Sequence, residues 1–332
     1  MTREELLQHF LDKNGWGNAH HKPLASDASF RTYDRLTQNG KSAIFMNSPL
    51  SENPDKFVFF DELLAKSGIR VPKILAKDMD NGFILLEDFG DNTFTKLLKE
   101  DTDEYVLYKM GVDTLIKLQK NIVIPTEGIE TYTDEQMLNG VMLLPNWFGK
   151  YVLPKGLPEQ AVQSFKTIWE KLIKKIESSP KTLTLLDYHV DNLMITKENE
   201  CGVLDFQDAR LGPIGYDLMS LLEDERRDVS KETRENLTDY YFKQMPEWNT
   251  PDIRETLPIV AMQRHTRVIG LFVRLFLRDK KEKYLKMIPF IWELTERNLN
   301  NPLFKDYKDW LDTYIPPAFR KKNLTQEDFN AQ

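Results

Sequence analysis

Three polar residues in the middle of the chain, Asp187, Asn192 and Asp205, constrain its fold more than any other feature. Two short apolar segments, 193–195 and 202–204, flank a polar turn between Asn192 and Asp205, which is the pattern of a β-hairpin. Such a hairpin returns the chain, so we expect Asp205 to face Asn192. An amide and a carboxylate supply the hard oxygen ligands that Mg²⁺ prefers.

The order and spacing of these residues are typical of kinase-type phosphotransferases. In this interpretation Asp187 is the catalytic base, Asn192 and Asp205 are the metal ligands, and ATP and Mg²⁺ are the cofactors. A pair spaced as Asp187 and Asn192 is weak evidence alone, because solvated loop acids are common in a chain of this composition. The joint pattern with Asp205 is more specific. Asp217 follows at the start of a helix, where we expect it to cap the helix or to brace the catalytic loop.

Motifs along nearly the whole chain resemble those of the aminoglycoside phosphotransferase/choline kinase superfamily, and more narrowly those of bacterial N-acetylmuramate/N-acetylglucosamine anomeric kinases. The resemblance implies an α+β, protein-kinase-like bilobal fold. It also implies an ATP-dependent kinase acting on the anomeric hydroxyl of an amino sugar in peptidoglycan recycling. The segments that carry the narrow resemblance are 26–31 (SDASFR), 85–91 (LLEDFGD), 187–189 (DYH), 205–209 (DFQDA), 211–213 (LGP), 216–221 (YDLMSL), 263–265 (QRH) and 315–317 (IPP).

Composition excludes several other classes of protein. The net charge of −7 argues against a nucleic-acid-binding surface, which needs a basic stripe. A single cysteine, Cys201, excludes an intrachain disulfide and suits a reducing compartment. The longest apolar run, 268–277, contains Arg274 and is too short to span a bilayer. We therefore expect a cytoplasmic protein whose partners are small molecules, without a membrane or an obligate protein partner.

Local signals predict a small sheet-containing N-lobe over residues 1–87, a hinge at 88–91 and a helical C-lobe over 92–332. The N-lobe signals are a capping box at Thr2, an Asn39–Gly40 turn and alternating apolar residues. We expect five antiparallel strands and one helix between them, followed by helices. The predicted elements are a first helix that starts at the capping box of Thr2 and is stopped by Gly15, strand–turn–strand 21–36, strand 42–46, helix 54–66, strands 74–77 and 83–87, and helices 94–98, 105–118, 134–144, 159–176, 217–223, 231–244, 254–277, 281–299 and 302–314.

Two segments are expected to bind the nucleotide. The loop after the first strand has no glycine, but its small residues let backbone N–H groups approach phosphates, and its serines add hydroxyl donors. In the family that the chain resembles, the linker between the lobes binds the adenine edge; a plain acidic loop is the alternative. The predicted nucleotide-binding residues are Ser26, Ala28, Ser29, Arg31, Glu87 and Phe89.

One position departs from the broad kinase pattern. Met46 stands where the strand should carry the lysine that binds the phosphates. The cell-wall sugar kinases that the chain resembles lack this lysine too, so another cation should neutralise the triphosphate. Arg31 is our candidate, with an exposed strand arginine as the alternative; Arg35 and Lys41 are weaker candidates.

Residues near the metal-binding aspartate are expected to bind the acceptor. We predict this role for His189, Gln207, Asp208 and Arg210, although a histidine at position 189 also suits hydrogen bonding to the loop backbone. A muramic acid needs a cation for its lactyl carboxylate. The candidate donors are Arg210, Arg264 and Arg267.

Two alternatives remain open at this point. The acids of segment 223–225 suit a cationic acceptor, so an aminoglycoside-like or choline-like alcohol is one alternative. Met46 motivates a catalytically silent nucleotide-binding module, against which the intact Asp187, Asn192 and Asp205 argue because a pure binder needs no base.

Overall fold

The computed structural model describes residues 1–24, 30–100, 102–153, 155–177, 179–321, 323–325 and 327–328. The chain divides into two compact units. Unit 1 comprises Met1–Ile124 and Asp187–Ala209, and unit 2 comprises Pro125–Leu186 and Arg210–Gln332. The segment that contains Asp187, Asn192 and Asp205 therefore belongs to the unit that holds the N-terminal strands. The predicted boundaries at the hinge 88–91 stay a prediction.

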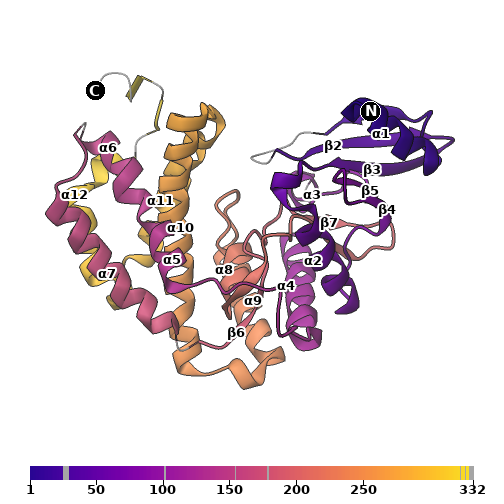
Figure 1. The fold of residues 1–332 in the computed structure, drawn as a ribbon. Helices are drawn as coiled ribbons and strands as arrows, with labels where there is room; N and C mark the ends of the chain where they lie inside the picture. The colour runs from indigo at the N-terminus through magenta and orange to yellow at the C-terminus, as the bar shows by residue number, and fades with distance from the viewer. Residues whose placement is uncertain are drawn as a thin grey trace. The chain divides into compact units, whose positions relative to one another are not determined.

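Unit 1 contains a fully antiparallel sheet that has five strands among the described residues, in the order β1-β2-β3-β5-β4 (Figure 1). The turn between β2 and β3 uses Asn39 and Gly40 at φ values of 50° and 73°, which suit a tight hairpin. The predicted strands are thus confirmed. Their bounds are β1 His20–Pro23, β2 Thr32–Gln38, β3 Lys41–Asn47, β4 Ile74–Asp78 and β5 Phe83–Glu87.

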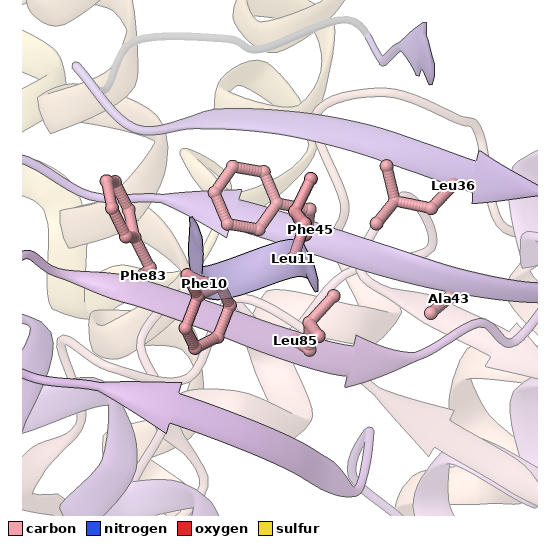
Figure 2. Packing of buried hydrophobic residues seen from close by; sticks show 7 residues of the cluster. All are labelled: Phe10, Leu11, Leu36, Ala43, Phe45, Phe83 and Leu85. Carbon is pink, nitrogen blue, oxygen red and sulfur yellow. The ribbon is translucent and has the colours of Figure 1, made fainter. Parts of the chain in front are cut away.

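Alternation along β3 separates the two faces of the sheet. Ala43 and Phe45 are buried against helix α1 (Arg3–Lys13), whose predicted capping box forms between Thr2 and Glu5. Figure 2 shows the resulting apolar cluster, which joins helix α1 to strands β2, β3 and β5. Because side chains alternate along a strand, Met46 belongs to the other face. The cluster contains Phe10, Leu11, Leu36, Ala43, Phe45, Phe83 and Leu85.

The remaining elements of unit 1 bring the catalytic segment onto this N-terminal part of the chain. Hairpin β7–β8 is held by hydrogen bonds from Val203 N to Arg70 O (2.8 Å) and from Ile195 N to Asn92 O (2.9 Å). The Tyr188 hydroxyl donates to Gly111 O in helix α4 at 2.9 Å. The bounds are η1 Leu50–Glu52, α2 Pro54–Lys66, α3 Phe94–Lys99, α4 Glu104–Asn121, β7 Leu193–Ile195 and β8 Cys201–Val203.

Unit 2 is mainly helical and is organised around the long helix α10 (Figure 1). Strands β6 and β9 form an antiparallel pair that the sequence analysis did not predict. The bounds are α5 Asp134–Val141, η2 Leu144–Phe148, α6 Gly149–Val152, α7 Glu159–Glu177, β6 Lys181–Thr184, β9 Arg210–Pro213, α8 Tyr216–Leu222, α9 Lys231–Gln244, η3 Pro246–Trp248, α10 Pro251–Asp279, η4 Glu282–Met287, α11 Ile288–Asn298, η5 Pro302–Phe304, α12 Lys305–Tyr314 and α13 Pro317–Arg320.

Three predicted helices of unit 2 differ from the structure. The helix predicted over 134–144 ends at Val141, and a π-helical turn follows. Those predicted over 281–299 and 302–314 each begin with a 3₁₀ segment. Pro289 and Pro302 lie at the starts of helical segments, because proline has no N–H to give to a preceding turn. Within the described residues, none of the helices has the length and apolarity to cross a membrane.

Candidate functional site

The hairpin β7–β8 brings the predicted metal ligands together, as its sequence pattern indicates. Leu204 N donates to Asn192 O at 2.9 Å, which closes the hairpin base. The Asn192 amide nitrogen donates to Asp187 O at 2.9 Å and lies 3.4 Å from Asp205 Oδ2. Asp205 has a left-handed backbone, φ 57°, a conformation that Asp tolerates better than most residues. Asp187, Asn192 and Asp205 therefore form one group within unit 1.

The electrostatics of Asp205 suit a cation-binding group. The Asp205 side chain is exposed to solvent, but many protein atoms surround its carboxylate and displace part of its hydration. This loss of hydration raises the pKa of Asp205, and the nearby charges of Asp187 and Asp208 raise it further, against the opposing effects of Gln207 and Arg31. Gln207 Nε2 donates to Asp205 Oδ1 at 2.7 Å and fixes the carboxylate. A bound cation would relieve this repulsion.

The donor set fits a magnesium ion shared with phosphates rather than a closed protein metal site. Among the described residues, no three His, Cys, Asp or Glu side chains gather as a metal cluster. Mg²⁺ is ordinarily held by one or two protein oxygens and completes its shell with water and phosphate oxygens. The pair of Asn192 and Asp205 is a donor set of this size.

Of the three candidate cations for the place of the missing lysine, Arg31 is the one that is buried. Met46 is fully buried and is the cross-strand partner of Tyr33. Arg31 is 6% exposed, donates to Glu52 O at 2.7 Å and hydrogen bonds to Tyr33. Its charge acts on Asp205. Burial raises the pKa of Tyr33 to about 12, although Arg31 opposes this shift. The sequence analysis missed Tyr33, whose only sequence signal is its place two residues after Arg31.

Helix α2 packs against the segment that follows Asp205 through aromatic side chains. Phe57 of helix α2 stacks on Phe206, the residue after Asp205, with ring centroids 5.1 Å apart. Both side chains are buried. Helix α2 therefore supports the segment that follows Asp205 by apolar packing.

Two arginines, Arg70 and Arg35, bind the predicted linker within unit 1. Arg70 binds both oxygens of Glu87, at 2.7 and 2.5 Å, and these bonds hold the pKa of Glu87 below its usual value. The same guanidinium lies 4.7 Å from the centre of the buried Phe89 ring. The Glu87 side chain is thus occupied, and its backbone N–H donates to Lys73 O at 2.9 Å, so its role toward a nucleotide stays a prediction. Arg35 binds the following residues: Asp88 Oδ2 (2.9 Å), Gly90 O (2.8 Å) and Asp91 Oδ1 (2.7 Å).

The weaker candidate cations therefore differ from Arg31 in their surroundings. Arg35 is committed to the linker acids. Lys41 is exposed beside the Asn39–Gly40 turn, paired across the sheet with Gln38. Neither acts on the charge of Asp205 in the way that Arg31 does.

The predicted acceptor-binding residues fall into different environments. His189 is buried, and its Nε2 lies 3.4 Å from the Asn192 amide nitrogen, so the contact seen is to the catalytic loop. Gln207 is buried on Asp205, and Asp208 is exposed. In unit 2, Arg210 lies 3.4 Å from Glu130. Their roles toward an acceptor stay predictions.

Three predicted phosphate-binding residues, Ser26, Ala28 and Ser29, lie outside the described residues. Their roles therefore also stay predictions. Cys201 is buried, and burial raises the pKa of its thiol to about 12, which suits a structural thiol rather than a nucleophile.

In unit 2, Asp217 braces the segment that leads into Asp187. Its two carboxylate oxygens accept from Leu185 N (2.7 Å) and Leu186 N (3.0 Å). On the other side of Leu186, its carbonyl accepts from Ser220 Oγ (3.4 Å) and from Arg264 Nη1 (2.8 Å). Arg264 is buried and also binds Glu225, so it is not placed to receive a substrate carboxylate as the sequence analysis considered.

Comparison with known proteins decides the family. The sequence model of the phosphotransferase enzyme family matches residues 20–254. The chain belongs to this family. It is an enzyme of the phosphotransferase class, as the spacing of Asp187, Asn192 and Asp205 predicts.

Curated relatives match this phosphotransferase over most of its length. A protein of Caulobacter vibrioides named N-acetylmuramate/N-acetylglucosamine kinase is 29% identical, with 96% of this chain and 98% of the relative covered. A protein of the same name from Pseudomonas aeruginosa is 33% identical, with 88% of each covered.

Solved structures confirm the fold of the phosphotransferase. A choline/ethanolamine kinase family protein from Mesorhizobium loti superposes with a TM-score of 0.65 at 12% identity, covering 94% of this chain and 100% of the other. The ADP-bound aminoglycoside phosphotransferase APH(2'')-Ib superposes with a TM-score of 0.60 at 15% identity, covering 88% and 96%. At these identities the likeness concerns the fold, and the predicted protein-kinase-like class is confirmed.

Proposed function

We propose that this phosphotransferase is an ATP-dependent sugar kinase that phosphorylates the anomeric hydroxyl of N-acetylmuramate, N-acetylglucosamine or both. The observation that carries the proposal is the grouping of Asp187, Asn192 and Asp205 by the hairpin and by the Asn192 hydrogen bond to Asp187 O. The acceptor comes from the names of relatives that match 80–96% of the chain. The proposed phosphoryl-transfer chemistry rests on Asp187, Asn192 and Asp205.

Asp187 has the role of orienting the acceptor hydroxyl and taking its proton as the new oxygen–phosphorus bond forms. Phosphoryl transfer passes through a loose transition state, so the position of this carboxylate matters more than its basicity. Mg·ATP, when bound, supplies the γ-phosphoryl group and spreads the developing charge over the metal. Asn192 and Asp205 would hold the metal, and Gln207 orients Asp205.

Arg31 is the residue that we assign to the phosphates in place of the absent strand lysine. Its burial, its hydrogen bonds to Glu52 O and Tyr33, and its effect on Asp205 support this assignment. The backbone of segment 87–89 and the predicted loop residues 26–29 complete the proposed nucleotide site. The name of an ADP-bound structural neighbour agrees with nucleotide use.

The experiment that tests the function is ADP release with Mg·ATP and N-acetylmuramate, N-acetylglucosamine, glucose, choline or kanamycin as acceptor. ³¹P NMR of the product locates the phosphate. An acid-labile anomeric phosphate on an N-acetyl amino sugar is the expected result. Turnover on choline or kanamycin alone would retain the phosphotransferase chemistry and reject the sugar. ATP binding without turnover on any acceptor would favour the silent module that Met46 suggests.

The role of Asp187 has its own test. Asp187→Asn should abolish turnover while nucleotide affinity stays near that of the wild type, because Asp187 is assigned to the acceptor hydroxyl. Asp191→Asn, in the same loop but exposed and hydrogen-bonded to Thr95, is a neighbouring acid-to-amide control and should retain turnover. Turnover of Asp187→Asn near the wild-type rate would remove Asp187 from this role.

A further inference from the structure

The peptide group that enters Asp187 is held in an uncommon conformation. Leu186, the preceding residue, has φ 70°, in the left-handed region that side chains other than Gly, Asn and Asp rarely adopt. Such a backbone costs free energy and persists only where its surroundings fix it. Asp217 fixes one side of Leu186 by accepting from the N–H groups of residues 185 and 186.

Arg264 fixes the other side. Its Nη1 donates to Leu186 O at 2.8 Å, and this carbonyl shares its peptide plane with the nitrogen of Asp187. Rotation of that plane would swing the Asp187 side chain. Ser220 reaches the same oxygen only at 3.4 Å. Arg264 therefore makes the stronger of the two bonds that orient the plane.

The surroundings of Arg264 leave it little freedom. Its guanidinium is 3% exposed, its Nη2 lies 3.2 Å from Glu225 Oε2, and the Tyr216 ring lies 5.5 Å away. Glu225 is 1% exposed; burial acts to raise its pKa, but the charges of Arg264, His265 and Arg226 hold the pKa of Glu225 below its usual value. A buried arginine with a buried counter-ion and one backbone carbonyl to bind is a rigid support.

We propose that Arg264, held by Glu225, is a positioning residue that orients Asp187 through the Leu186 carbonyl. It acts on the chemical step rather than on nucleotide binding, since the proposed nucleotide-binding residues lie elsewhere in the chain. The inference rests on the proposed role of Asp187. It also replaces the earlier candidacy of Arg264 as a carboxylate-binding residue.

The test uses a double variant, Arg264→Met/Glu225→Met, because removing one charge alone would leave the other buried without the partner that it has here. We expect the melting temperature to stay close to that of the wild type, kcat to fall about 10- to 100-fold and KM for ATP to stay within about twofold. Arg264→Lys keeps a donor and a charge, so it should recover part of kcat.

The matched control is a second buried arginine of unit 2. Arg320 is 1% exposed and forms ion pairs with Glu296 (2.7 Å) and Asp312, and not with residues 185–186. Arg320→Met/Glu296→Met should keep the wild-type kcat. Equal losses of kcat in the two double variants, or an unchanged kcat in Arg264→Met/Glu225→Met, would overturn the proposal.

Hydrogen exchange provides a readout that does not depend on the acceptor. The Arg264→Met/Glu225→Met variant should exchange the amides of residues 186–188 faster than the wild type, with the remaining helix amides of unit 2 unchanged. Unchanged exchange there would overturn the proposal even if no acceptor supported turnover. Failure of the wild type to phosphorylate an N-acetyl amino sugar would instead reject the proposed function, and it would leave the exchange result unchanged, so the two failures are distinguishable.

Discussion

At the scale of single residues, we expect Arg31 to bind the phosphates in place of the absent strand lysine. The strand position expected to hold lysine is a buried methionine, Met46, and its cross-strand partner Tyr33 hydrogen bonds to Arg31. Arginine suits such a position, since its planar fork can hold Glu52 O and Tyr33 while still presenting charge. The proposed phosphate-binding cation therefore immediately precedes strand β2 and is not on strand β3.

Arg31→Met should lower kcat/KM for ATP by roughly 10²- to 10³-fold, the size of effect seen when a positioned donor to a developing negative charge is removed. Arg31→Lys should retain part of the activity. Lys41→Met, which removes an exposed cation at the far end of the neighbouring strand, is the control and should behave as the wild type. Steady-state kinetics at varied ATP measure all three, and a threefold or smaller loss in Arg31→Met would contradict the assignment.

Asp205→Asn should abolish the stabilisation by Mg·ATP and raise the melting temperature of the ligand-free protein. Burial and the charges of Asp187 and Asp208 raise the pKa of Asp205, so its ionised form is disfavoured in the folded protein. The amide removes this repulsion, and we expect a higher melting temperature without ligand but no further rise when Mg·ATP is added. Thermal unfolding with and without Mg·ATP measures both effects. An equal nucleotide-induced rise in variant and wild type would exclude Asp205 as a metal ligand.

At the scale of elements, helix α10 is the centre of unit 2, and one glycine sets its closest approach to another element. A Cβ at Gly270 would lie 2.2–2.5 Å from the backbone of Leu143 and Leu144, where the π-helical turn begins. Backbone atoms cannot make room for an added Cβ in the way that the end of a flexible side chain can. The close crossing therefore depends on the absence of a side chain at this position.

Gly270→Ala should destabilise the protein by about 3 kcal/mol or more, although alanine favours a helix by about 1 kcal/mol. Gly140→Ala is the matched control, since its Cβ would meet only side chain atoms of Gln263 and Arg267 at 3.2–3.4 Å. It should change stability by less than about 1 kcal/mol. Urea unfolding of both variants measures the difference, and similar midpoints would show that the crossing has room to adjust.

At the scale of the whole molecule, stability should depend on pH through a buried acid that the proposed reaction does not use. Asp61 of helix α2 is 5% exposed, and burial, with Glu62 nearby, raises its pKa to about 7. In the unfolded chain an aspartate titrates near pH ~4. Between these values the folded state holds a proton that the unfolded state has lost. The contribution of Asp61 to the free energy of unfolding therefore falls as pH rises from about 4 to about 7 and is constant above pH ~7.

Asp61→Asn should remove this component. The variant and the wild type should be similarly stable near pH 4, and at pH 8 the variant should be more stable by up to about 4 kcal/mol, the upper limit for a shift of about three pKa units. The exposed Asp80→Asn is the control and should give a curve parallel to that of the wild type. Urea unfolding across this pH range measures the curves. A constant difference between Asp61→Asn and wild type would contradict the assignment.

Features of the fold that depend on a few neighbouring residues can be predicted from the sequence, whereas features that join distant residues cannot. The Asn39–Gly40 turn and the hairpin around Asn192 and Asp205 follow from patterns within a few residues, and both are confirmed. The pairing of strands β6 and β9 is not predicted, because its partners are about 30 residues apart. The contact of Arg264 with Leu186 spans 78 positions, so no local pattern reveals it.

The return of the chain to unit 1 has a consequence for protein synthesis. Residues 1–124 leave the ribosome well before residues 187–209, yet both segments belong to unit 1. During that interval Arg70 O and Gly111 O lack the donors from Val203 and Tyr188 that they have in the finished protein. The N-terminal unit therefore cannot reach its native contacts as a nascent chain until the first part of unit 2, residues 125–186, has been translated.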